Sequence, residues 1–170
     1  MKNIAVLVED LYQDLEVWYP ILRLKEEGYK VYAVGPGRAK VYKSKHGYEI
    51  PEDMNIHEAK KLDFAAVVIP GGFAPDLLRR CEEINSFVAE NFKKGRVIAS
   101  ICHGGWVLVS AGILKGKTAT SFFAIKDDLV NAGAKYVDSE VVVDGNLITS
   151  RKPEDLPAFL KAIIKALKSL

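Results

Sequence analysis

Cys102 is the residue of this sequence whose surroundings most clearly suggest chemistry. It follows the apolar run Val97–Ile101 and precedes His103 and two glycines. A buried strand that delivers a nucleophile into a sharp turn before a helix is a nucleophile elbow, where glycines leave room for substrate. Free N–H groups at the start of the helix are expected to lower the pKa of the thiol. The alternative is that Cys102 is a small core residue, the usual fate of a free cysteine.

A second pair of glycines follows another apolar run. Residues 64–69 read as a buried strand, and the segment 70–72, Pro-Gly-Gly, comes directly after it. Because the carboxyl ends of parallel strands meet at one edge of a sheet, the N–H of Gly72 is expected near Cys102. Together with the N–H of His103, it is predicted to hold a developing oxyanion. On their own, two glycines after a strand also suit an ordinary turn into a helix.

His103 is the best candidate for a catalytic base. The other two histidines, His46 and His57, both precede Cys102 in the sequence. Class I glutamine amidotransferases place their base after the nucleophile, so a triad of that order is absent. A histidine next to a nucleophile can also point away from it and serve only in packing.

Glu16 falls in the first turn of the helix expected after the first strand, at the same edge of the sheet. A carboxylate there can simply complement the helix dipole. Buried beside a thiolate it would behave differently, because two anions cannot share a dry site and one of them must hold a proton. A protonated Glu16 would donate a hydrogen bond to the sulfur of Cys102.

The elements that must position these residues alternate along the chain. Apolar runs at residues 4–8, 64–69 and 97–101 predict parallel strands buried on both faces of a sheet. A helix is expected from residue 11 to Gly28, with apolar positions at Leu11, Leu15, Trp18 and Leu22, widened by Val17, Ile21 and Leu24. Further helices are expected at residues 85–92, 104–111, 125–131 and from Pro153 onward, with antiparallel structure at 37–51 and a hairpin at 141–149.

These elements predict an α/β fold: a flavodoxin-like three-layer sandwich with a mostly parallel central sheet and a small antiparallel hairpin. We expect residues 1–170 to form one domain. Residues 97–114 contain no acidic or basic side chain, but Gly104 and Gly105 interrupt them, which favours a strand, a turn and a helix over a membrane span.

Composition narrows the possible partners and the compartment. The 24 basic and 22 acidic residues give a formal net charge of +2 without long runs of like charge, so no nucleic-acid partner is expected. Only two cysteines and no secretory leader indicate reduced thiols in the cytoplasm, with Cys81 as a bystander. No Cys/His pair has ligand spacing and no dinucleotide or phosphate motif occurs, so neither a metal nor a cofactor is expected.

The sequence resembles the PfpI intracellular protease and deglycase family of the ThiJ/PfpI superfamily, which is related to class I glutamine amidotransferases. The segments that carry the resemblance run over nearly the whole chain: 45–48 (KHGY), 70–72 (PGG), 99–104 (ASICHG), 125–128 (IKDD), 131–134 (NAGA) and 141–146 (VVVDGN). The resemblance implies that Cys102 is the nucleophile, that Glu16 is a protonated carboxyl touching its sulfur and that His103 is the base.

The resemblance also implies dimers or hexamers in which a neighbouring subunit completes the site. Asp76 stands where members of the family have a glutamate that orients the histidine from the adjacent subunit, and its side chain is shorter. Phe122 replaces a usual tyrosine and Phe73 replaces an arginine, while Gly105-Trp106 replaces a Pro-Gln pair. These differences make the mouth of the site more apolar.

The expected function is therefore that of a cytoplasmic cysteine hydrolase, a peptidase or a deglycase and glyoxalase. Its substrates would be small peptides or methylglyoxal-modified proteins, because thiolate addition to a carbonyl serves both. The competing reading is an oxidative-stress sensor or holdase chaperone in which Cys102 is oxidised rather than catalytic. A glutamine amidotransferase subunit is a third reading, which the lack of a downstream histidine disfavours.

Overall fold

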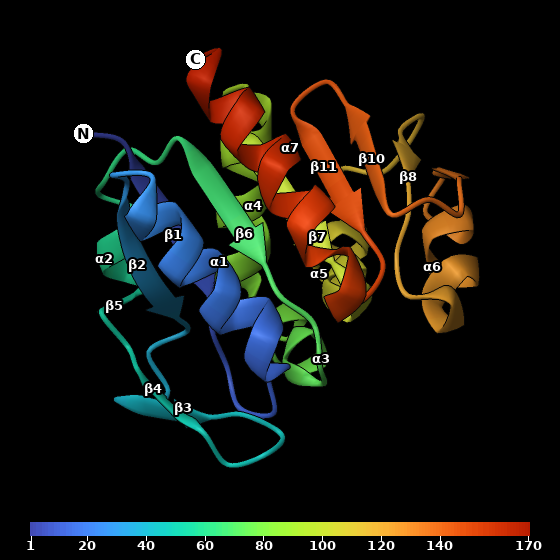
Figure 1. The fold of residues 1–170 in the computed structure, drawn as a ribbon. Coiled ribbons are helices and arrows are strands. Elements are labelled where there is room, and N and C mark those ends of the chain that lie inside the picture. The colour runs from blue at the N-terminus through green and yellow to red at the C-terminus, as the bar shows by residue number, and fades with distance from the viewer.

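The structure is a computed structural model that describes all 170 residues. Its centre is a seven-stranded sheet of order β10-β11-β7-β6-β1-β2-β5 (Figure 1). The strands of this sheet are β1 (Asn3–Leu7), β2 (Lys30–Gly35), β5 (Met54–Asn55), β6 (Ala66–Ile69), β7 (Val97–Ile101), β10 (Val141–Asp144) and β11 (Leu147–Ser150). All neighbours are parallel except the antiparallel pair β10–β11. The predicted mostly parallel α/β sandwich with a hairpin is confirmed.

Helices cover both faces of the sheet (Figure 1). They are α1 (Asp14–Glu26), α2 (Ile56–Ala59), α3 (Ala74–Arg79), α4 (Glu82–Lys93), α5 (Gly105–Ser110), α6 (Lys126–Asn131) and α7 (Leu156–Lys168). The longest, α1 and α7, have 13 residues each, and no helix is long and apolar enough to cross a bilayer.

Two hydrophobic cores lie on opposite faces of the sheet because successive strand side chains point to opposite sides. In β1, Ile4 and Val6 pack with α1 and α7, whereas Ala5 and Leu7 belong to the core under α2, α4 and α5. A strand buried on both faces needs apolar residues at every position, which explains the continuous apolar runs of β1, β6 and β7.

The prediction for the first helix needs correction in two respects. The helix begins at Asp14, because Leu11 has a left-handed φ of 63° that no helix accommodates. Its buried face carries Val17, Ile21 and Leu24, while Leu15 and Leu22 are 56% and 60% exposed. Val17, Ile21 and Leu24, which were expected only to widen the apolar face of the helix, therefore form its centre. The direction in which the chain leaves β1 sets which side of the helix meets the sheet.

The segment after β7 is tighter than expected. Cys102–Gly104 forms a 3₁₀ turn, and α5 begins only at Gly105 and ends at Ser110. A Cβ at Gly104 would lie 2.5 Å from the Ile69 carbonyl oxygen at the end of β6, so only glycine allows this approach. Gly104 therefore allows the 3₁₀ turn to pack directly against the end of β6.

The four remaining strands form two separate two-stranded sheets. β3 (Val41–Lys43) and β4 (Glu49–Pro51) make the antiparallel pair expected between residues 37 and 51. β8 (Thr118–Ala119) and β9 (Lys135–Tyr136) pair in parallel. The return strand of the predicted hairpin, β11, joins the main sheet beside β7. The loop between β3 and β4 approaches the carboxyl end of the sheet, where Tyr12 bridges to Ser44.

Candidate active site

Cys102 occupies a strained turn at the carboxyl end of β7. Its φ of 58° lies in the left-handed region, which is costly for a residue with a side chain. The residue is 8% exposed, so the thiol is largely covered but reaches the surface of a cavity of about 350 Å³. Strain of this kind is typical of functional turns, and it supports the elbow predicted from the sequence.

Glu16 lies against Cys102, as the sequence led us to expect. It is the third residue of α1, and its side chain is completely buried. Oε2 accepts a hydrogen bond of 2.7 Å from the N–H of Gly71, whereas Oε1 has no hydrogen-bond partner. A Cβ at Gly71 would lie 2.4 Å from Glu16 Oε2 and 2.7 Å from Cys102 Cβ, so a glycine is required where the carboxyl meets the thiol.

The burial of Glu16 favours its neutral form. Desolvation raises the pKa of Glu16 to about 7, against the opposing effect of hydrogen bonds from Gly71 and Cys102. A substantial fraction of the carboxyl is therefore protonated at neutral pH. The protonated carboxyl that the family resemblance implied stays a prediction, and the raised pKa supports it.

The thiol does not show the lowered pKa expected from the elbow. Burial, and next the negative charge of Glu16, raise the pKa of Cys102 to about 12. The N–H groups of His103 and Gly72 act in the opposite direction but are the smaller causes. The helix that was expected to stabilise a thiolate is only six residues long and is separated from Cys102 by the 3₁₀ turn. The thiol is thus protonated at neutral pH, and an ionised Glu16 disfavours the thiolate further.

His103 reaches the sulfur even though the two residues are adjacent in the chain. Its Nδ1 lies 3.2 Å from Cys102 Sγ. Its ring stacks on Phe122 at a centroid distance of 4.9 Å and meets the edge of Trp106 at 5.1 Å. Desolvation, followed by the charge of Lys45, lowers the pKa of His103. The imidazole is consequently neutral at neutral pH and able to accept a proton from the thiol.

The N–H groups of Gly72 and His103 are near enough to Cys102 to affect the pKa of its thiol. Gly72 has a left-handed φ of 81°, and its Cβ position would collide with the backbone of the β1–α1 loop, 2.5 Å from Gln13 N. The N–H groups of Gly72 and His103 each favour the negative form of Cys102. A substrate oxygen bound beside the sulfur would meet the same two donors.

Asp76 is not part of the site within one chain. It lies in α3, where its carboxylate pairs with Arg80 at 2.6 Å, and it does not line the cavity beside Cys102. A contact with His103 therefore requires a second subunit, as the resemblance implied. Cys81 is also remote from the cavity, and burial raises the pKa of its thiol.

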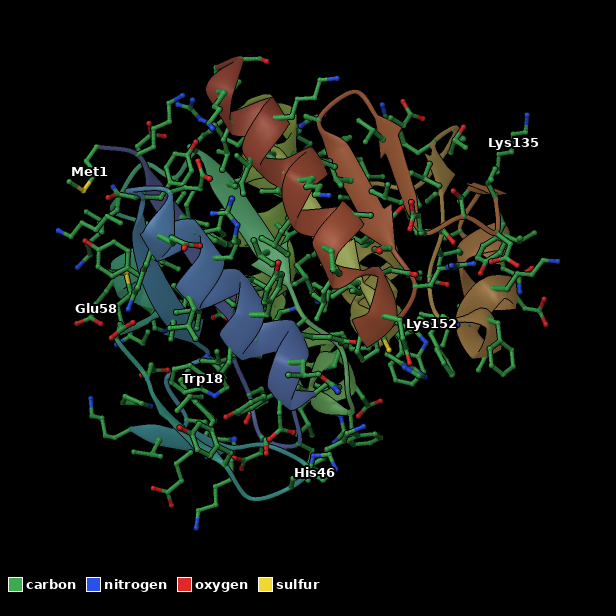
Figure 2. The ribbon with its side chains drawn as sticks, viewed as in Figure 1. Met1, Trp18, His46, Glu58, Lys135 and Lys152 are labelled. Atoms are coloured by element: carbon green, nitrogen blue, oxygen red, sulfur yellow. The ribbon has the colours of Figure 1, made fainter.

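The cavity contains residues to which the sequence gave no role. Its lining consists of Leu11, Gln13, Glu16, Lys45, Gly72, Phe73, Cys102, His103, Phe122 and Pro153. Phe73 and Phe122 were noted as departures from the family, and both make the mouth apolar. Lys45 belongs to the segment 45–48 that carries the resemblance, which is the one signal that pointed to it. Figure 2 labels His46 and Lys152, the chain neighbours of the lining residues Lys45 and Pro153.

Comparison with known proteins gives the family. A family model described as the DJ-1/PfpI family matches residues 2–166. The chain belongs to the DJ-1/PfpI family. A deglycase of Thermococcus kodakarensis is 44% identical over 166 residues, which cover 98% of this chain and 99% of the relative. A provisionally named cysteine protease of Bacillus subtilis is 42% identical over 167 residues, covering 98% of this chain and 99% of the relative.

Solved structures of DJ-1/PfpI proteins share the fold. A two-domain protein of Anabaena variabilis, with DJ-1/ThiJ/PfpI-like and ferritin-like domains, is 44% identical with a TM-score of 0.96. The match covers 99% of this chain but 48% of that protein, so this chain spans about half its length. Members of the DJ-1/PfpI family at this similarity include named deglycases, which supports an enzymatic role in general terms.

Proposed function

We propose that this chain is a cysteine hydrolase in which Cys102 adds to a carbonyl group, with deglycase or glyoxalase activity as the leading possibility. The observation that carries the proposal is the placement of Cys102 Sγ 3.2 Å from a neutral imidazole, on a left-handed turn. A core cysteine would need neither the strained backbone nor the neighbouring base. The deglycase names among the relatives support the substrate class.

The first step follows from the protonation states of the site. Because burial keeps the Cys102 thiol protonated, its proton passes to Nδ1 of His103 as sulfur attacks the carbonyl carbon. The carbon–oxygen double bond opens, and its electron pair becomes an oxyanion held by the N–H groups of Gly72 and His103. A proton on Glu16 removes the repulsion between its carboxyl and the negative sulfur.

With methylglyoxal, the adduct is a hemithioacetal once the oxyanion takes a proton. His103 then moves the proton of the carbon bonded to sulfur to the neighbouring carbonyl carbon, and the hydroxyl proton on the first carbon passes to the oxygen of that carbonyl, which yields a lactoyl thioester. Water hydrolyses this thioester to lactate and returns the thiol, so no oxidant or reductant is consumed. With a peptide, the same addition would be followed by expulsion of an amine that receives the proton from His103.

The apolar mouth favours the small-carbonyl reaction over peptide cleavage. Phe73 and Phe122 offer no hydrogen-bond donors to a peptide backbone, and the cavity of about 350 Å³ suits a small adduct. Modified proteins can still present such an adduct on an exposed side chain. Peptidase activity is therefore the second candidate, supported by the Bacillus relative.

Three accompanying expectations remain proposals. Residues 1–170 act as one domain, and the chain forms dimers or hexamers in which Asp76 of a second subunit approaches His103. A cytoplasmic location fits the two free cysteines, Cys81 and Cys102, neither of which is paired.

Turnover by single-cysteine variants tests the proposal. We expect Cys102→Ser to lose at least about 100-fold in kcat/KM with methylglyoxal, because a serine hydroxyl is a far weaker nucleophile here. Cys81→Ser is the matched control and should retain wild-type turnover. A fluorogenic peptide assayed in parallel decides between deglycase and peptidase activity. Full turnover by Cys102→Ser on both substrates contradicts the proposed nucleophile.

The alternative function, an oxidative-stress sensor, uses the same Cys102 thiol. Measuring the mass of the protein after peroxide treatment distinguishes it from the hydrolase. An acidic group beside the sulfur, such as Glu16, would also stabilise a sulfinate formed by peroxide. Stoichiometric addition of two oxygen atoms at Cys102, without turnover of either substrate, would favour the sensor. Turnover that depends on Cys102 and His103 favours the hydrolase.

A further inference from the structure

Lys45 is the one side chain with a permanent charge in the lining of the catalytic cavity. The lining contains one carboxyl group, that of Glu16, and its Oε2 accepts a hydrogen bond from the N–H of Gly71. None of the ion pairs of the chain includes Lys45. Its ammonium group is therefore available to an anion that enters the cavity.

The loop that carries Lys45 is fixed by hydrogen bonds. The N–H of Lys45 donates to the carbonyl of Tyr12 at 3.0 Å, just before α1. The neighbouring Ser44 is buried, and its Oγ donates to Asp14 Oδ1 at 2.7 Å and accepts from the N–H of Tyr48 at 3.0 Å. Little backbone freedom is lost when Lys45 engages a ligand, because the loop is already ordered.

The positive charge of Lys45 affects the pKa of two groups beside Cys102. It lowers the pKa of His103 and of Glu16, which stand beside the sulfur of Cys102. An anionic group of a substrate that pairs with Lys45 would consequently lie close to the carbonyl under attack. Lys45 is the only lysine or arginine of the lining, so it is the point of the cavity that can recognise a negative charge.

We propose that Lys45 selects substrates with a carboxylate near the carbonyl group that Cys102 attacks. An adduct formed on the amino group of a free amino acid has this chemistry, and so does an adduct beside an acidic side chain of a protein. The inference rests on the proposed nucleophilic role of Cys102. It adds that the enzyme prefers anionic adducts to neutral adducts as substrates.

The first test compares two alkylating agents that differ in charge. Iodoacetate and iodoacetamide are used on Cys102 in a Cys81→Ser background, and the ratio of their rates is measured at low salt. We expect Lys45→Met to lower the iodoacetate-to-iodoacetamide ratio about 3- to 10-fold. Lys45→Arg should preserve the ratio, and added salt should reduce the wild-type preference.

The matched control is Lys43→Met. Lys43 lies two residues away, carries the same charge and pairs with Glu49 at 3.2 Å outside the cavity. Its loss should leave the ratio unchanged. An unchanged ratio in Lys45→Met, or an equal fall in Lys43→Met, overturns the inference.

The second test uses turnover. Adducts of methylglyoxal with alanine and with alaninamide differ only in the carboxylate, and we expect Lys45→Met to raise KM for the alanine adduct alone. A modified peptide with aspartate or asparagine beside the adduct shows whether a protein carboxylate is recognised instead. Absence of a Lys45 effect in both pairs overturns the substrate preference.

The two proposals fail separately. If Cys102 reacts with neither alkylating agent, the nucleophile itself is wrong and the inference falls with it. If the alkylation ratio depends on Lys45 but no substrate is turned over, the anion site stands and the hydrolase does not.

Discussion

Glu16 affects the ionisation of Cys102 because the two acidic groups are buried side by side. Oε1 of Glu16 has no hydrogen-bond partner, and burial raises the pKa of Glu16 to about 7. Burial likewise raises the pKa of Cys102 to about 12, with the charge of Glu16 as the next cause. The pair therefore prefers to retain a proton, which is why the proposed mechanism assigns the removal of the thiol proton to His103.

The raised pKa of Glu16 has a consequence for stability. An unfolded chain ionises this carboxyl near its ordinary pKa of about 4.3, so between that pH and about 7 the native state binds more protons than the unfolded state. Stability must fall as pH rises through this window, by about 4 kcal/mol for this group. We expect Glu16→Gln to gain that amount relative to wild type on going from pH 4 to pH 8, measured by denaturant unfolding.

The comparison has to be made as a difference between variants. His103 has a lowered pKa, so its contribution is present above about pH 6.5 and is lost as pH falls below it, opposite to Glu16. His103 is common to wild type and Glu16→Gln, so its effect cancels. Glu26→Gln, at a side chain that is 74% exposed, is the control and should show no such trend. Parallel pH curves for wild type and Glu16→Gln would contradict a raised pKa.

At the scale of elements, the β3–β4 loop places Lys45 over the cavity. Ser44 Oγ donates to Asp14 at 2.7 Å and accepts from the N–H groups of His46 and Tyr48, each at 3.0 Å. His46 Nδ1 also contacts Asp14 Oδ2 at 2.8 Å, so the start of α1 and this loop form one unit. A single buried hydroxyl therefore connects the loop to the helix that carries Glu16.

Removal of this hydroxyl is expected to loosen the loop. Ser44→Ala should cost about 1–3 kcal/mol in the free energy of unfolding, because it removes three hydrogen bonds between a buried hydroxyl and partly buried partners. Ser169→Ala, which removes one hydrogen bond at the exposed end of α7, should change stability by less than about 0.5 kcal/mol. Hydrogen exchange of the N–H groups of His46 and Tyr48 locates the effect. Equal stability of Ser44→Ala and wild type would show that the loop is held by other contacts.

On the scale of the whole molecule, an apolar face leads from α1 to the catalytic cavity. A shallow pocket is lined by Leu15 and Tyr19 of α1 together with Pro153, Leu156 and Pro157 around the start of α7. Pro153 also lines the cavity beside Cys102. A second subunit bound to this face would come close to the site, which is what the proposed contribution of Asp76 requires.

The oligomer can be tested through this face. We expect Leu15→Glu combined with Leu22→Glu to shift a dimer or larger assembly to monomer, because charges would have to be buried at the interface. Sedimentation velocity over a range of concentrations measures the change. Leu62→Glu, at an exposed leucine after α2, should leave the assembly intact. A wild-type chain that remains monomeric at high concentration would contradict the proposed assembly.

Local patterns in the sequence determined the elements and the turn that carries Cys102. The continuous apolar runs of β1, β6 and β7 predict strands buried on both faces, and residues 97–105 show the strand, Cys102 and the glycines of the elbow directly. The alternation of elements likewise predicts the parallel sheet and the edge at which the site lies. These features depend on neighbours in the chain, so a single sequence contains them.

Only the tertiary structure decided which distant residues meet and with what protonation. It turned Val17 rather than Leu15 toward the core, left Oε1 of Glu16 without a hydrogen-bond partner, and reversed the expected shift in the pKa of the thiol. It also brought Lys45 to the cavity and left Asp76 paired with Arg80. The physical reason is that desolvation and charge depend on everything packed around a group, which strand order and crossing loops determine and local periodicity does not.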